Sequence, residues 1–213
     1  DPGDPDDPGD SDDTGDAEPA NVIVSVALDV TEKVLTTSAD ETDQHRFRFL
    51  ATFTDGHTER IVGGVEWILD NAHIGTLDDH GLFVTSTTQG GTASVVGRLD
   101  DFWSAAELTV KYEGSLVPDG FDVSVFEVSE VPEGGTGMIY PEDGVMMPKN
   151  QPAIHFQWEN LGAISYRLRF ESEVTDLSIY STDLSWISDA ELWPVIGRSN
   201  AGLEVTSTLS AYM

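Results

Sequence analysis

Cysteine is absent from this chain, and basic residues are scarce. Without cysteine the chain has no disulfide, no thiolate nucleophile and no cysteine metal site. Only 10 lysines and arginines face 39 acidic residues, which gives a formal net charge of -29. Binding to phosphate needs clustered lysine and arginine, so this balance argues against nucleic acid and against an anionic membrane as partners.

Long hydrophobic runs are also missing. No stretch approaches the roughly 20 apolar residues of a membrane span, and no signal peptide is visible. Because the chain begins at an aspartate in a low-complexity tract, we expect a mature or trimmed chain whose targeting segment has been removed. The 213 residues exceed the usual size of one β-sandwich, about 100 residues. Two modules and an appendage are therefore expected.

The appendage is the acidic tract of residues 1–20, which consists mainly of Asp, Pro and Gly. It has little apolar surface to bury, and repulsion between its carboxylates favours an extended, disordered tether. A calcium loop is the alternative, because oxygen-bearing side chains alternate before a glycine at the sixth position. These residues are Asp10, Asp12, Thr14 and Asp16. Asn21 stands where such a loop needs a bidentate glutamate. Calcium is the only cofactor that we consider.

Residues 21–113 show hydrophobic side chains at every second position, which is typical of strands with one buried side. Turn-forming pairs such as Asp55-Gly56 and Gly90-Gly91 separate the runs, as in an all-β sandwich. The runs are Val22 to Val30, Phe47 to Phe53, Val65 to Leu69, Ala93 to Leu99 and Leu108 to Tyr112.

The same stretch carries a series of short motifs in a recognisable order. They include Phe53-Thr-Asp-Gly-His57, Val65-Glu-Trp67, Gly81-Leu-Phe-Val84 and Gly91-Thr-Ala-Ser-Val95. This order resembles the bacterial immunoglobulin-like group 2 domain, and the resemblance implies a small β-sandwich over 21–113. The chain departs from the family after Trp67 and in the loop from Leu99 to Trp103, which is longer and more aromatic.

Residues 114–137 are interpreted as a connector, with a short strand possible where Phe121, Val123 and Val125 alternate. Residues 138–213 form a second β-module. Its Trp158, its Tyr166 and the run from Trp193 to Gly202 resemble a divergent fibronectin type III domain, which implies a strand ending in that run. A single helical turn is expected at residues 188–191, stopped by Pro194. The predicted fold class is all-β, with two tandem immunoglobulin-like β-sandwiches after the disordered acidic tail.

Catalytic motifs do not emerge from the sequence. Asp78, Asp79 and His80 could ligate a metal, but the same residues are what a tight turn before Gly81 selects. The other histidines are isolated, and no Gly-x-Ser-x-Gly motif or phosphate loop is found. We therefore expect no enzyme activity and no catalytic residue.

One loop is the candidate for binding a partner, because aromatic residues at the end of a sandwich can anchor a protein or stack on a sugar. Its residues are Asp100, Asp101, Phe102 and Trp103. The alternative is that Trp103 folds back onto its own sandwich or packs on the second module.

These features predict a non-catalytic, modular cell-surface or secreted protein with an adhesion, spacer or scaffold role. Its location would be extracellular or on the outer cell surface, compatible with a fragment of a lipoprotein. Other surface proteins or a polysaccharide are the expected partners, and the oligomeric state stays open. One alternative is a carbohydrate-binding accessory module of a larger secreted enzyme. Another is a structural subunit of an extracellular surface assembly, whose strand edges pair with neighbours.

Overall fold

The computed structural model describes residues 21–127, 137–148, 150–151, 153–188 and 192–213, and the fold is all-β. The tether and the calcium hypothesis fall on residues 1–20 and so lie outside the described residues.

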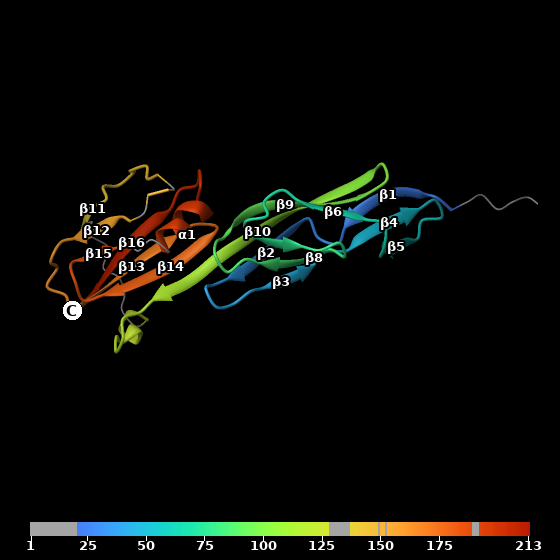
Figure 1. The fold of residues 1–213 in the computed structure, drawn as a ribbon. Coiled ribbons are helices and arrows are strands. Elements are labelled where there is room, and N and C mark those ends of the chain that lie inside the picture. The colour runs from blue at the N-terminus through green and yellow to red at the C-terminus, as the bar shows by residue number, and fades with distance from the viewer. Residues whose placement is uncertain (1–20, 128–136, 149, 152, 189–191) are drawn as a thin grey trace, which may run out of the picture.

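The first half of the chain folds into strands arranged around one hydrophobic core. Strands β1, β4 and β5 form one sheet, β3, β8 and β7 form another, and β2, β10, β9 and β6 belong to the largest sheet (Figure 1). The strands are β1 (Ile23–Leu28), β2 (Glu32–Thr37), β3 (Gln44–Arg46), β4 (Phe49–Phe53), β5 (Thr58–Ile61), β6 (Glu66–Leu69), β7 (Gly75–Leu77), β8 (Leu82–Thr85), β9 (Gly91–Leu99) and β10 (Phe102–Leu116).

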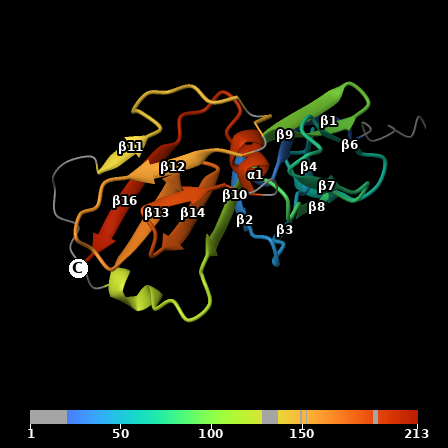
Figure 2. The same cartoon turned by 60° about the vertical axis from the view of Figure 1, so that its left-hand side comes forward.

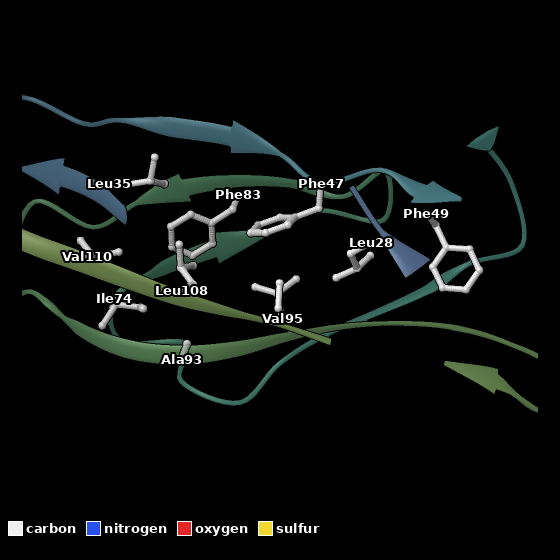
Figure 3. Packing of buried hydrophobic residues seen from close by; sticks show 11 residues of the cluster. Leu28, Leu35, Phe47, Phe49, Ile74, Phe83, Ala93, Val95, Leu108 and Val110 are labelled. Atoms are coloured by element: carbon white, nitrogen blue, oxygen red, sulfur yellow. The ribbon is translucent and has the colours of Figure 1, made fainter. Parts of the chain in front are cut away.

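The core of this half is formed by the inward sides of these strands, as the alternation of hydrophobic residues predicts. Phe47, Phe49 and Phe83 are fully buried there, and Leu108 of β10 lies beside Phe83 (Figure 3). Strand β1 differs from the prediction, because Val22 and Val24 are 52% and 53% exposed. The pairing register of β1 with β4 shifts between Ile23 and Ser25, so the buried side of β1 changes along its length.

The second half has two facing sheets and one helix. Strands β11, β12 and β15 form the smaller sheet, while β16, β13 and β14 continue the largest sheet from β10 (Figure 2). The elements are β11 (Met138–Tyr140), β12 (His155–Trp158), β13 (Ser165–Glu171), β14 (Thr175–Ser181), β15 (Ser185–Ile187), α1 (Leu192–Ser199) and β16 (Thr206–Tyr212). A second buried cluster, which includes Phe156, Trp158, Tyr166 and Phe170, lies between the sheets.

Strand β10 runs through both halves. Its first part pairs with β9 and β2, and its end pairs in parallel with β14. The amide of Glu107 donates to Thr31 on the β2 side, whereas the amide of Tyr112, which points to the opposite edge, donates to Val174. Strand β14 therefore pairs with the same edge of β10 as β9 does, beyond the residue where the pairing with β9 ends. The boundary expected after residue 113 falls inside this strand.

Two local predictions are wrong in the second half. Val123–Phe126 forms a 3-10 helix, η1, and not a strand, because the Asp122 carboxylate accepts a hydrogen bond from the Ser124 amide and starts a helical turn. The run from Trp193 forms α1 rather than a strand. Pro194 lies in the first turn of α1, where its missing amide hydrogen has no helical partner to lose, and the helix continues past it. The helical turn expected at residues 188–191 falls mostly outside the described residues.

Candidate functional site

The candidate loop is the tight turn between β9 and β10. Leu99 pairs with Phe102, so only Asp100 and Asp101 lie outside the ladder. Asp100 has a φ of 51°, a left-handed conformation that aspartate tolerates better than most residues. Both carboxylates are exposed. The turn thus places two negative charges at the tip of the hairpin.

The alternation of side chains along β10 places Trp103 on the outer face of the sheet. Ala106 and Leu108 of β10 point into the first core, so Trp103 and Ala105 point to the opposite side of the sheet. Trp103 is 66% exposed, and the half-buried Phe102 faces the inner side. The indole is therefore presented to solvent instead of packing back onto its own sandwich or on the second half.

Neighbouring strands extend this exposed site into a continuous surface. Pairing places Val96 of β9 beside Ala105, and Ile68 of β6, which is 40% exposed, beside Val96. These four residues, Trp103, Ala105, Val96 and Ile68, are here called the Trp103 face. Arg98 lies opposite Trp103 in the ladder and forms an ion pair with Glu66. Sequence reasoning missed Val96 and Ile68, since only the strand register brings them to Trp103.

Carboxylates border the Trp103 face at both ends. Asp100 and Asp101 lie at the turn, and Glu107 follows Ala105 on the outer side of β10. Glu107 lies directly opposite Glu32 of β2, and both are exposed. Like charges at opposed positions of neighbouring strands destabilise a sheet. The border is therefore electrostatically unfavourable in the isolated chain.

The Asp78 to Gly81 segment is a turn between β7 and β8. The Asp78 carboxylate accepts hydrogen bonds from the amides of His80, at 2.9 Å, and Leu82, at 2.7 Å. The Leu82 amide is the main cause that lowers the pKa of Asp78 below its usual value. Both amides donate to the same oxygen, Oδ1, so the backbone engages the Asp78 carboxylate as the turn interpretation requires.

The histidines are distributed over separate parts of the fold. His57 bonds to Asp55 in its own turn, His73 is exposed before β7, and His155 belongs to β12 in the other half. Within the part of the chain that the structure describes, no group of three or more histidine or acidic side chains is arranged to hold a metal.

A buried joint connects the two halves, and sequence reasoning did not find it. The Gly90 amide, just before β9, donates to the Ser199 hydroxyl at the end of α1, at 2.9 Å. Next to it, the Asn200 side chain donates to the Thr175 hydroxyl at 2.8 Å and accepts from Ser172. In the sequence, Gly90-Gly91 and the run that ends at Asn200 each indicate only a turn, and neither predicts the contact between them.

An ion cluster lies beside this joint on the outer side of the shared sheet. Arg169 of β13 donates two hydrogen bonds to Asp176 of β14, and Lys111 of β10 lies 3.4 Å from the same carboxylate. The Arg169 guanidinium is the main cause that lowers the pKa of Asp176. Lys111 belongs to the part of β10 that pairs with β2, so the cluster spans the two halves.

Among the described residues, none of the helices is long and apolar enough to cross a membrane. No protein-family model matches the chain, and no curated protein matches it. Several solved structures do. A fragment of the S-layer protein SbsC, domains 5-6, is 8% identical with a TM-score of 0.34, covering 91% of this chain and 99% of that chain. SbsC domains 1-6 are 11% identical with a TM-score of 0.35, covering 89% of this chain and 26% of that chain.

InvD of Yersinia pseudotuberculosis is 16% identical with a TM-score of 0.28, covering 91% of this chain and 58% of that chain. The chain also spans 53% of a fragment with SbsC domains 4 and 5. It thus corresponds to only part of most of these structures. Similarities at this level assign neither a family nor a function to the chain.

Proposed function

We propose that this chain is a non-catalytic spacer and adhesion segment of an exported protein, located at the cell surface or secreted. The two halves would be an immunoglobulin-like domain of the bacterial group 2 type and a fibronectin type III-like domain. A fragment of a lipoprotein, tethered through the acidic residues 1–20, fits this role.

The observation that carries the proposal is the continuity of β10 through both halves. A flexible linker would let two domains reorient, which is the default for modular proteins. Here one strand supplies Val110 to the first core and Tyr112 to the second, and hydrogen bonds on both edges hold it. A spacer needs this stiffness to hold a binding surface at a fixed distance from its anchor.

Distance measurements between spin labels test the stiffness, and the absence of cysteine permits selective labelling. One label is placed at Glu59→Cys on β5 and the other at Thr208→Cys on β16, since both positions are exposed. The control pair, Glu59→Cys with Thr92→Cys, lies within the first half. We expect the distance distribution across the halves to be as narrow as the control distribution. A broad or multimodal distribution would contradict the spacer role.

A structural subunit of a surface assembly is the second candidate. It is favoured by β1, which is an end strand of its sheet: Val24 in the strand and Val22 just before it are each more than half exposed. Light scattering over a range of concentrations separates the two functions. A strict monomer counts against self-assembly and leaves the spacer role unaffected.

A further inference from the structure

We propose that the Trp103 face docks a basic protein segment, whose apolar side chains cover the indole and whose lysines or arginines meet the bordering carboxylates. This proposal rests on the adhesion role above and names its surface and the chemistry of its partner. The spin-label distances test the stiffness of the chain, and the peptide titration below tests docking, so one proposal can be contradicted while the other stands.

The apolar centre of the surface has the composition of an interaction hot spot. Trp103 is 66% exposed and stands beside Ala105, with Val96 and Ile68 on the neighbouring strands. Exposed tryptophans surrounded by smaller apolar groups contribute strongly to binding, because a partner excludes water from a large, rigid ring. Four apolar side chains in register on three strands form a surface of this kind.

The surface is supported from beneath and therefore changes little on binding. Gly97 of β9 lies behind it, and a Cβ atom there would come within 2.7 Å of the Phe49 ring on the inner side. Phe49 itself is fully buried. Because the sheet rests directly on packed core side chains, a partner would not have to order the surface first, and preorganised surfaces bind at lower entropic cost.

Charge distinguishes a basic protein segment from the other possible occupants. Glu32 and Glu107 oppose each other at one end, and Asp100 and Asp101 stand at the other. The nearest cation in the ladder, Arg98, is neutralised by Glu66. Lysines or arginines of a partner would relieve the repulsion, and the net charge of -29 would attract them from a distance. A neutral polysaccharide would neither relieve this repulsion nor be attracted by the net charge.

The test uses three defined probes and the full chain labelled with ¹⁵N. The probes are a synthetic peptide of alternating Lys and Val, its Glu and Val counterpart, and cellohexaose as a neutral glycan. We expect the Lys and Val peptide to shift the Trp103 indole signal and the amides of β6, β9 and β10, while the other two probes shift none of them.

Matched variants locate the interaction. Trp103→Ala should weaken binding of the Lys and Val peptide about tenfold or more. Ile164→Ala, at an equally exposed site in the second half, should change it less than about twofold. Replacing Glu32 and Glu107 together by Gln should weaken binding more than the same change at the exposed Glu159 and Glu204. Thermal melting of each variant verifies folding.

Three results would overturn the proposal. The first is a response spread evenly over the acidic surface with no loss in Trp103→Ala, which would indicate unspecific charge attraction. The second is a shift of the Trp103 indole by cellohexaose instead of the peptide, which would assign the surface to a polysaccharide. The third is the absence of binding by every probe at millimolar concentration.

Discussion

Gly90 occupies the tightest position between the two halves of the molecule. A Cβ atom there would lie 2.4 Å from the carbonyl oxygen of Val174 and 2.6 Å from that of Val110. Val110 belongs to β10, and the Val174 carbonyl, just before β14, accepts a hydrogen bond from the Tyr112 amide, so neither backbone segment can move freely. Glycine is needed at this site because two chain segments approach closely.

Gly90→Ala should therefore lower the free energy of unfolding by about 1–3 kcal/mol, the usual cost of inserting a methyl group into a packed site. Thermal unfolding followed by circular dichroism measures the effect. Gly63→Ala is the control, since a Cβ atom at Gly63 meets nothing within 4 Å. Equal melting temperatures for Gly90→Ala and the wild type would show that the joint is looser than the structure indicates.

At the scale of elements, the segment that follows β10 is held against the second half by aromatic contacts. The Phe126 ring of η1 lies 5.7 Å from Tyr180 and 6.4 Å from Tyr212, and the Arg167 guanidinium lies 5.6 Å above it. Phe121 packs on Tyr180 from the same segment, at 5.4 Å. The residues interpreted as a connector thus begin as a strap across the outer side of β13, β14 and β16.

Phe126→Ala should release this strap and cost about 3 kcal/mol, because a buried aromatic ring and its cation-π contact are lost. Hydrogen exchange should rise in residues 118–127, and a protease should cleave there sooner. Val117→Ala, in the same segment but 41% exposed, serves as the control. Unchanged exchange in Phe126→Ala would mean that other contacts hold the strap.

Local sequence patterns explain most of the strands but not the connections between distant ones. The alternation of Phe47, Phe49 and Ala51 predicts a buried strand side, and the Asp78 turn follows from backbone chemistry. Pairing between Tyr112 and Thr175 has no local signal, so the sequence did not predict that β10 continues past residue 113 to Leu116. The candidate loop was selected because it departs from the pattern of the family that the sequence resembles, and its role in binding stays a prediction. Its neighbours on β6 and β9 were not predictable, since they depend on register.

The two short helices escaped prediction for related reasons. Val123 to Phe126 has a strand-like composition, and only the Asp122 cap and the tertiary contacts of Phe126 favour a helical turn. In α1, Trp193 and Ile196 are buried three positions apart, a helical spacing too short to separate from the strand patterns around it.

At the scale of the whole molecule, the two cores lie under one sheet and should lose their structure together. Opening the first core would detach β9 and β2 from β10, and β10 would then no longer pair stably with β14. The ion cluster of Lys111, Asp176 and Arg169 adds a further connection. We therefore expect the two halves to unfold in one cooperative transition.

Calorimetry should accordingly show a single transition for the full chain. Leu35→Ala removes a side chain that is 3% exposed in the first core and should cost about 2–5 kcal/mol. The indole signals of Trp158 and Trp193 in the second half should disappear at the same lowered temperature as that of Trp67. Val34→Ala, where the side chain is 63% exposed, is the matched control. Two resolved transitions would show independent domains.

Because both halves use β10, loss of this strand would leave an open sheet edge on the second half. A chain cut after residue 116 and separated from its first half would leave β14 with an unpaired row of backbone amides and carbonyls where Tyr112 to Leu116 of β10 had been. Such an open edge recruits strands from other molecules, so the isolated second half should aggregate. Proteolytic cleavage just after residue 116, followed by loss of the first half, would therefore release an aggregation-prone fragment of this strongly acidic protein.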